Sequence, residues 1–214
     1  MNKKWIGFGL YALIANTVAQ SHASDFDLLA RKCAPWVATQ TLAAIAETES
    51  AFNPFAIGVN GGYRLERQPR SKDEAVKRAK WFVANGYKVD LGLVQISIAN
   101  LNALGFSIED AFDPCQNLSI GAGILQDNYL LARTKMDDDQ AALFAALSAY
   151  NTGSFTRGIT NGYVRKVVRN AVKGSTSISR KVPNSTVAFR KNEIDANPSE
   201  ENVYSMMDRS VMVY

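Results

Sequence analysis

Both the fold and the chemistry of this chain are decided by the stretch between residues 36 and 50, WVATQTLAAIAETES. Its apolar residues recur with the spacing of a helix that buries one face, and Asn53-Pro54 ends that helix. Leu42, Ile45 and Glu49 follow the i, i+3, i+7 rule and therefore share a face. A carboxyl group on an otherwise apolar face is the first candidate for chemistry.

Burial disfavours the ionised form of a carboxyl group, so the pKa of Glu49 should rise and leave the group protonated near neutral pH. A protonated carboxyl group can act as a general acid. Glu47 cannot share this role, because two residues along a helix means about 200° of rotation, to the opposite face. By itself, a glutamate on such a face is more often a paired structural residue than a catalytic one.

The first 23 residues have the pattern of an export signal. Lys3 and Lys4 precede an uncharged, mostly apolar run at residues 5–15. Ser21 and Ala23 supply the small residues at the −3 and −1 positions, which predicts cleavage after Ala23. A membrane anchor is the alternative, but the run is shorter than the roughly 20 residues that span a bilayer. We expect a periplasmic protein with no integral membrane segment after cleavage.

The remaining chain, residues 24–214, suits one domain plus an appendage. Cleavage removes Lys3 and Lys4, so the formal net charge falls from +4 to +2, which is too weak to indicate a nucleic-acid partner. The single histidine, His22, lies in the signal. Its loss excludes His-dependent nucleophilic triads and argues against the usual zinc sites. We expect no metal and no cofactor.

Cys33 and Cys115 are the two cysteines. In an oxidising compartment, one disulfide is the simplest use of an even count. Two unpaired buried thiols are the alternative. Closing so long a loop would stabilise the fold by roughly 4–5 kcal/mol in the chain-entropy model.

Capping residues and apolar periodicity predict further helices after the first. Their approximate bounds are residues 71–85, 115–133, 138–150 and 163–172. Ser71 and Glu74 would form a capping box at the start of the first of these, Asp113-Pro114 would open the second, and Asp138 or Asp139 would cap the third. The glycine-rich segment 58–69 is predicted to be an irregular loop with short strand pairs as an option. Residues 87–98 should form a turn and a short buried stretch, and residues 151–162 a loop.

Two further segments offer groups that a substrate could meet. In GLVQI, residues 92–96, Gln95 places an amide in an apolar run, beside a glycine that allows close approach. In AYNTG, residues 149–153, a helix ends by presenting Tyr150 and Asn151. Aromatic planes and amides suit sugar rings. Each segment by itself could also be structural, as a buried strand or as an asparagine-capped helix end.

Together, Glu49-Ser50, GLVQI and AYNTG resemble, in order and approximate spacing, the lytic transglycosylases of the soluble-lytic-transglycosylase type. The resemblance spans residues 30–168. It extends to Asp113-Pro114, Asn117, Gly121 and Tyr163-Val164.

Three more segments resemble the branch of that family attached to type IV secretion and conjugation machines. They are CAP at residues 33–35, NPFAIG at 53–58 and VDLGL at 89–93. Val94 stands where methionine is usual, which is a conservative core change. Ser97 stands where asparagine often follows and could alter a contact with substrate.

The resemblance implies an α+β, predominantly α-helical, lysozyme-like fold with a small irregular or β lobe and a sugar cleft between the lobes. The transglycosylase domain would cover residues 24–173. Beyond residue 174, Ser, Asn, Lys and Arg dominate and apolar residues are scattered, which predicts a flexible C-terminal tail over 174–214. Its last stretch, residues 203–214, regains Tyr, Met and Val, which is typical of a docking segment or of an apolar terminus without a function.

The resemblance also implies a mechanism. Glu49 would protonate the glycosidic oxygen between N-acetylmuramic acid and N-acetylglucosamine in peptidoglycan strands. Its carboxylate would then deprotonate the muramyl 6-hydroxyl, which closes on C1 and leaves a 1,6-anhydro end. The implied partners are glycan strands and components of the secretion or conjugation apparatus. Tyr163 would pack beside Glu49, Ser50 would support the site by hydrogen bonding or structurally, and Gln95, Tyr150 and Asn151 would bind sugars.

Two other functions stay open at this point. A hydrolysing muramidase needs a second carboxylate, and Asp90, next to GLVQI, is the candidate. A non-catalytic peptidoglycan-binding assembly module would act through its C-terminal tail, although the intact Glu49 argues against it.

Overall fold

The structure, a computed structural model, describes residues 25–179. The predicted export signal and residues 180–214 of the predicted tail lie outside this range. Residues 25–33 are helical. The helices that follow are α2 (Thr39–Ser50), α3 (Lys72–Ala84), α4 (Ile98–Leu104), α5 (Ile108–Ala111), α6 (Pro114–Arg133), α7 (Asp139–Thr152), α8 (Arg157–Thr160) and α9 (Tyr163–Ser179). The strands are β1 (Ile57–Val59), β2 (Val89–Leu91) and β3 (Ile96–Ser97).

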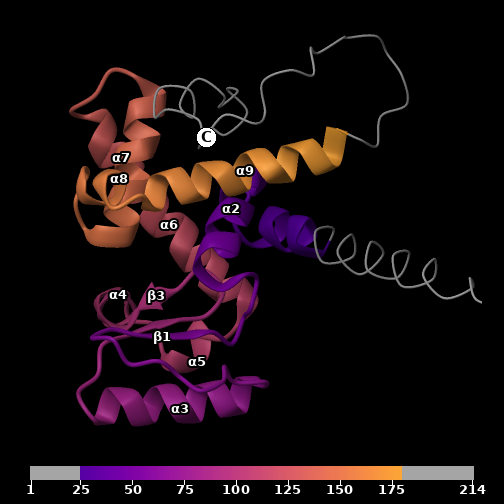
Figure 1. Ribbon diagram of the computed structural model, residues 1–214, viewed down its shortest axis with the longest axis vertical. Helices are drawn as coiled ribbons and strands as arrows, with labels where there is room; N and C mark the ends of the chain where they lie inside the picture. The colour runs from indigo at the N-terminus through magenta and orange to yellow at the C-terminus, as the bar shows by residue number, and fades with distance from the viewer. Residues whose placement is uncertain (1–24, 180–214) are drawn as a thin grey trace, which may run out of the picture.

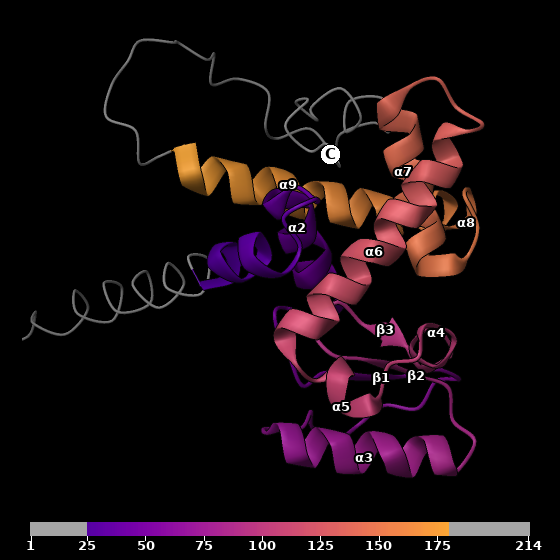
Figure 2. The same ribbon diagram turned by 180° about the vertical axis from the view of Figure 1, so that it is seen from behind.

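These elements form two lobes, which confirms the predicted α+β, mostly helical class. The larger lobe contains α2, α7, α8 and α9, and the smaller lobe contains the strands with α3, α4 and α5 (Figure 1). The long helix α6 starts in the small lobe and continues beside α7 in the large one (Figure 2). The two lobes are therefore joined through one continuous helix.

Three of the helices begin at the capping residues that the sequence predicts. The side chains of Ser71, Asp113 and Asp138 each accept a backbone N–H from the first turn of α3, α6 and α7 respectively. The capping box predicted at Ser71 forms only in part. The carboxylate of Glu74 accepts the backbone N–H of Arg70 at 3.0 Å instead of the N–H of Ser71.

Some elements differ from the prediction. The short helices α4, α5 and α8 were not predicted, because four to seven residues are too few for a helical period to be recognised. Helix α8 therefore lies inside the segment 151–162 that was predicted to be a loop. Helix α9 extends to Ser179, beyond the predicted end near residue 172.

The strands form one antiparallel sheet in the order β1-β2-β3. Ile57 pairs with Leu91 in the β1–β2 ladder. The partner of β1 therefore lies in the segment 87–98, and not within residues 58–69, where short strand pairs were considered. Val89 and Leu91 are fully buried, while Asp90 between them is partly exposed. Since successive side chains of a strand point to opposite faces, Asp90 lies on the other face of the sheet.

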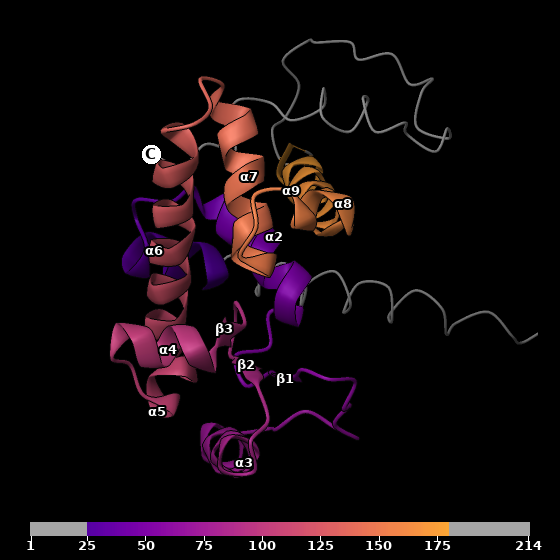
Figure 3. The same ribbon diagram turned by 90° about the vertical axis from the view of Figure 1, so that its left-hand side faces the viewer.

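Helix α2 packs on α9 in the large lobe. Its core-facing residues Leu42 and Ile45 are buried, as are Val164 and Val168 of α9. Helices α6 and α7 run side by side next to this pair (Figure 3). Glu47 is exposed and Glu49 partly buried, so the predicted difference between the two carboxylates is confirmed.

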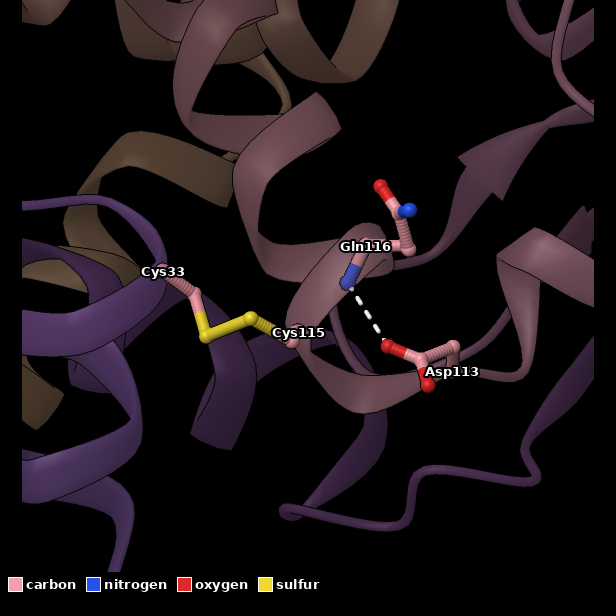
Figure 4. Close-up of a disulfide and its surroundings, with 4 residues drawn as sticks. All are labelled: Cys33, Asp113, Cys115 and Gln116. Atoms are coloured by element: carbon pink, nitrogen blue, oxygen red, sulfur yellow. Dashed lines mark hydrogen bonds between the residues drawn. A yellow bond between two sulfur atoms is a disulfide. The ribbon is translucent and has the colours of Figure 1, made fainter.

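A disulfide joins Cys33 to Cys115, with a Cα–Cα distance of 5.3 Å across 82 residues of sequence (Figure 4). This confirms the predicted pairing. Cys33 closes the helical segment before α2, and Cys115 lies in the first turn of α6, next to the Asp113 cap. The bond therefore fastens the segment that leads into α2 to the helix that joins the lobes.

Removal of this disulfide by Cys33→Ser with Cys115→Ser should lower the free energy of unfolding by roughly 4–5 kcal/mol, because the unfolded chain loses a long covalent loop. Denaturant titration of both proteins, with and without reductant, measures the effect. Reductant should destabilise the wild type and leave the double variant unchanged. Equal stability of the two proteins would contradict the prediction.

Candidate active site

Glu49 and Tyr163 form the centre of the candidate active site. Glu49 lies in the last turn of α2, and Tyr163 is the first residue of α9. The phenol of Tyr163 donates a hydrogen bond to Oε1 of Glu49 at 2.6 Å. Burial and the negative charge of Glu49 raise the pKa of Tyr163 well above its usual value, so its hydroxyl keeps the proton that it donates. This contact fixes one oxygen of the carboxyl group and leaves the other for chemistry.

The pKa of Glu49 is raised to about 7. Burial is the largest cause, since it disfavours the charged form, and the negative charge of Asp90 raises the pKa further. The hydrogen bond from Tyr163 and the positive charge of Lys166 act in the opposite direction. Near neutral pH the carboxyl group is poised between its two forms, which is the condition under which one group can donate a proton and then accept one.

Asp90 of β2 is the second carboxylate of this region. It is partly buried, and Asn60, just beyond β1, donates an amide hydrogen bond to its Oδ2 at 3.2 Å. Burial raises the pKa of Asp90, and the Asn60 hydrogen bond partly offsets this. The negative charges of both Glu49 and Asp90 also contribute to a pKa of Tyr150 well above its usual value, after burial. The two carboxylates and this phenol therefore share one electrostatic environment.

Residues 92–95 of the GLVQI segment form the turn between β2 and β3, and Asn117 of α6 holds it. The fully buried amide of Asn117 donates to the carbonyl oxygens of Leu91 and Ala111, both at 2.9 Å, and accepts the N–H of Val94 at 2.8 Å. Gly92 has φ +80°, and a Cβ there would lie 2.1 Å from the Ala111 oxygen. Only glycine fits both the backbone conformation and the space.

Two predicted site residues, Ser50 and Tyr150, use their hydroxyl groups to hold this turn. Ser50 donates to the carbonyl oxygen of Leu93 at 2.6 Å, and Tyr150 donates to that of Val94 at 2.7 Å. Both bonds connect helices of the large lobe to the turn. The ring of Tyr150 remains a surface that a sugar could meet, but its hydroxyl is committed to the backbone.

Gln95 lies in the same turn with a left-handed backbone, φ 51°. Its amide nitrogen donates to the carbonyl oxygens of Gly92 and Ala56. Its amide oxygen lies against Gly58, where a Cβ would approach within 2.7 Å. Glycine at position 58 thus gives the side chain of Gln95 room over β1, beside Asp90.

Asn151 occupies a different position from the other predicted residues. It is exposed at the end of α7, and its amide oxygen accepts a hydrogen bond from Asn161 at 3.2 Å. The side-chain oxygen of Asn161 in turn accepts the backbone N–H of Tyr163 at 2.9 Å. Asn151 therefore connects to Glu49 indirectly, through the loop that starts α9.

A family model described as the transglycosylase SLT domain matches residues 28–171, which contain every element of this site. The chain belongs to the transglycosylase SLT domain family. It is a lytic transglycosylase, an enzyme that cleaves glycosidic bonds of peptidoglycan, and its fold is the lysozyme-like fold of that family.

Relatives agree with this family over most of the chain. The type IV secretion system protein virB1 of Brucella suis biovar 1 (strain 1330) is 43% identical over 188 residues, which cover 83% of this chain and 79% of that protein. Protein virB1 of Rhizobium radiobacter is 45% identical over 146 residues, or 68% of this chain and 60% of that protein. No solved structure shows a significant match to the chain.

Several residues that shape this SLT site carry no recognisable signal in the sequence. The amine of Lys166 donates to the carbonyl oxygen of Thr48 at 3.0 Å, and the amide of Asn170 donates to the Thr48 hydroxyl at 2.9 Å. Both residues lie on α9, more than 115 positions away from their partner in the sequence. They fasten the last turn of α2, which carries Glu49, to α9.

The backbone that follows Glu49 is strained. Ala51 and Phe52 both have positive φ values, 51° and 62°, in a region that residues with a side chain rarely adopt. Each such residue costs on the order of 1–3 kcal/mol and persists only where its surroundings enforce it. The edge-to-face contact of Phe52 with Phe26, at 5.1 Å between ring centroids, is one such restraint.

Within residues 25–179, no group of three or more His, Cys, Asp or Glu side chains is arranged to hold a metal ion. None of the helices in that range is long and apolar enough to cross a membrane.

Substitution of Tyr163 by phenylalanine tests the positioning of Glu49. In the wild type, the hydrogen bond from Tyr163 lowers the pKa of Glu49. Without this bond the pKa should rise above about 7, and the alkaline limb of the pH profile of kcat/KM should move to higher pH. The rate itself should fall roughly ten- to hundredfold, since the carboxyl group loses its fixed orientation. Release of soluble glycan from peptidoglycan across pH measures both effects.

Tyr129→Phe is the matched control, because that hydroxyl donates to a carboxylate remote from the site, Asp139. An unshifted pH profile for Tyr163→Phe would contradict a role for Tyr163 in setting the pKa of Glu49.

The raised pKa of Glu49 also predicts a cost in stability. Between the unfolded value of 4.5 and the folded value of about 7, the unfolded chain ionises while the folded one resists, so stability falls as pH rises through this range. Glu49→Gln removes that cost and should be more stable than the wild type at pH 8, by roughly 3 kcal/mol. The difference should nearly vanish at about pH 4.5.

Denaturant titrations at the two pH values measure this difference. Glu47→Gln, at an exposed position on the same helix, is the control and should show no such pH-dependent gain. Identical stability of wild type and Glu49→Gln at pH 8 would mean that Glu49 is not desolvated.

Proposed function

We propose that this transglycosylase cleaves the β-1,4 bond between N-acetylmuramic acid and N-acetylglucosamine and leaves 1,6-anhydro ends, with Glu49 as its catalytic residue. The observation that carries the proposal is the partly buried carboxyl group of Glu49, which has a pKa raised to about 7 and is held by the Tyr163 hydroxyl. Such a group can serve as acid and base in one turnover.

The reaction has two proton transfers at Glu49. The protonated carboxyl group gives its proton to the glycosidic oxygen as the bond from that oxygen to C1 breaks. The resulting carboxylate takes the proton of the muramyl 6-hydroxyl, whose oxygen forms a bond to C1. Atoms and charges balance without water or a cofactor, and Glu49 returns to its protonated form.

Asp90 is the observation that favours a second candidate, the hydrolysing muramidase. Glycosidases that add water use a second carboxylate as base or nucleophile, and Asp90 lies near enough to Glu49 to raise its pKa. Its own raised pKa and its hydrogen bond from Asn60 fit an electrostatic role equally well. We favour the electrostatic role. The negative charge of Asp90 disfavours ionisation of Glu49, and it would attract the positively charged sugar of the transition state.

Ser50, Gln95 and Tyr150 would then line the sugar site, and Asn151 would contact sugar at the end of α7. Their hydrogen bonds to backbone suggest that Ser50 and Tyr150 shape the site and that Gln95 presents its amide oxygen. The sugar cleft between the lobes would be bordered by the GLVQI turn on one side and by the end of α2 on the other.

We also propose that the enzyme opens the wall locally for a type IV secretion or conjugation apparatus. Support comes from the 43% identity with the type IV secretion system protein virB1 of Brucella suis, over most of both chains. The proposed location is the periplasm, reached by a cleaved signal at residues 1–23, and the disulfide fits an oxidising compartment. The segment 174–214 would reach other components of the apparatus.

The products released from purified peptidoglycan test the chemistry. The wild type should release muropeptides lighter by one water than hydrolysed ones, as mass spectrometry can show, and Glu49→Gln should release almost none. Hydrated reducing ends from the wild type would establish a muramidase instead.

Asp90→Asn tests the second carboxylate. Loss of the Asp90 charge removes an influence that raises the pKa of Glu49, so the alkaline limb of activity should move to lower pH while the products remain anhydro. Asp127→Asn, an exposed carboxylate on α6, serves as the control. A complete loss of bond cleavage by Asp90→Asn at low pH as well would assign Asp90 a direct catalytic role.

A further inference from the structure

Four aromatic rings gather on and beside α3, which lies at the end of the small lobe away from α9 (Figures 1 and 3). We call them the aromatic patch: Tyr63, Trp81, Phe82 and Tyr87. Trp81 and Phe82 belong to the last turns of α3, Tyr63 follows β1, and Tyr87 precedes β2. Centroid distances between contacting rings run from 5.2 Å for Trp81–Phe82 to 6.3 Å for Trp81–Tyr87.

Three of these rings face solvent. Trp81 is 56% exposed, Tyr63 48% and Tyr87 37%, whereas Phe82 is buried at 5% and packs against all three. Rings that only complete a core would be covered. A contiguous exposed group of large aromatic side chains on a soluble domain marks an interaction site more often than an accident of packing.

The patch is rigid before any partner arrives. Phe82 touches each of the other rings, and the backbone N–H of Tyr87 donates to the carbonyl oxygen of Phe82 at 3.0 Å. The rings of Trp81 and Tyr87 are stacked, with their planes 23° apart, so each helps to hold the other in place. A preformed surface loses little conformational entropy on binding.

The surroundings of the patch are basic. The segment from Lys77 to Lys88 contains four basic residues and no acidic one. Two of the four are already paired, Arg78 with Glu74 and Lys80 with Glu109. Lys77, one helical turn before Trp81, and Lys88, next to Tyr87, are both exposed. A partner that suits this surface has flat apolar faces and carries negative charge.

We propose that the aromatic patch is a second binding site for peptidoglycan glycan strands, separate from the catalytic site. Sugar rings would stack their apolar faces on Trp81 and Tyr87, and the carboxylates of the peptide stems would meet Lys77 and Lys88. The proposal rests on the proposed function, since it takes peptidoglycan as the substrate.

The sheet lies between α3, which carries Trp81 and Phe82, and α2, which carries Glu49 (Figure 1), so a glycan bound at the patch would lie away from the catalytic site. Tyr87 packs on α3, which lies against β2, whereas Asp90 of the same strand acts electrostatically on Glu49. A second contact on an insoluble polymer raises the local concentration of the catalytic site along it. The patch would therefore hold the enzyme on the wall between cleavage events.

Sedimentation with purified peptidoglycan sacculi tests this in a Glu49→Gln background, where the polymer is not consumed. Adding Trp81→Ala and Tyr87→Ala should weaken binding roughly tenfold or more, since two ring contacts are lost. Leu130→Ala with Leu131→Ala on α6 removes apolar side chains of similar exposure, 56% and 52%, and should leave binding unchanged. Circular dichroism melts check that each variant folds.

Trp81→Phe gives a second measurement in case the double variant fails to fold. Soluble glycan strands should change the tryptophan fluorescence of the parent protein, and the change should disappear in Trp81→Phe. With Glu49 intact, Trp81→Ala should slow digestion of sacculi while short soluble fragments are cleaved at the normal rate.

Unchanged sedimentation of the patch variant would overturn the proposal, as would a variant that binds sacculi normally but no longer binds a protein of the secretion apparatus. Failure of the proposed function is a separate result, namely a wild type that releases no anhydro products. Patch variants that bind normally beside a wild type that releases those products would refute the patch alone.

Discussion

The amide of Asn117 is the constraint on which the rest of the site depends. Its three hydrogen bonds connect α6 to the end of β2, to the end of α5 and to the turn at Val94. Each of these backbone groups is buried, and a buried polar group left unpaired costs roughly 1–3 kcal/mol. The turn held in this way supplies the carbonyl oxygens that receive the hydroxyl groups of Ser50 and Tyr150. Helix α2, and with it Glu49, is therefore located relative to the sheet through Asn117.

The burial of Glu49 lowers the stability of the folded protein near neutral pH, but it gives the carboxyl group the pKa that acid–base catalysis needs. Burial is the main cause of its raised pKa and Asp90 adds to it, while the Tyr163 hydrogen bond and Lys166 limit the rise, so that the pKa is about 7. Without the influence of Tyr163 and Lys166 its pKa would be higher still, and the carboxyl group would be a weaker acid toward the glycosidic oxygen. A carboxyl group without burial would be ionised at the start and could not act as an acid. The two left-handed residues that follow α2 add strain at the same place, which is where proteins commonly carry it.

Local sequence patterns sufficed for features that depend on neighbours in the chain. The helical spacing around Glu49 predicted its partly buried position, the caps at Ser71, Asp113 and Asp138 predicted three helix starts, and an even cysteine count predicted the disulfide. Contacts between distant segments were beyond such patterns. A basic helix gave no reason to place the amine of Lys166 at the carbonyl oxygen of Thr48. The hydroxyl of Tyr150 was expected to be available for sugar, but its partner is a backbone oxygen 56 residues away.

The acidity of Glu49 depends on a fixed arrangement of the two lobes. The groups that set the pKa of Glu49 come from both: Tyr163 and Lys166 from α9, and Asp90 from β2. A shift of a few ångströms between the lobes would change the effect of Asp90, because the Coulomb energy between charges falls with their separation. The Cys33–Cys115 bond and the Asn117 amide both attach at the start of α6, the helix common to the two lobes. The disulfide and the Asn117 hydrogen bonds thus restrain the same end of α6, where a displacement between the lobes would alter the acidity of Glu49.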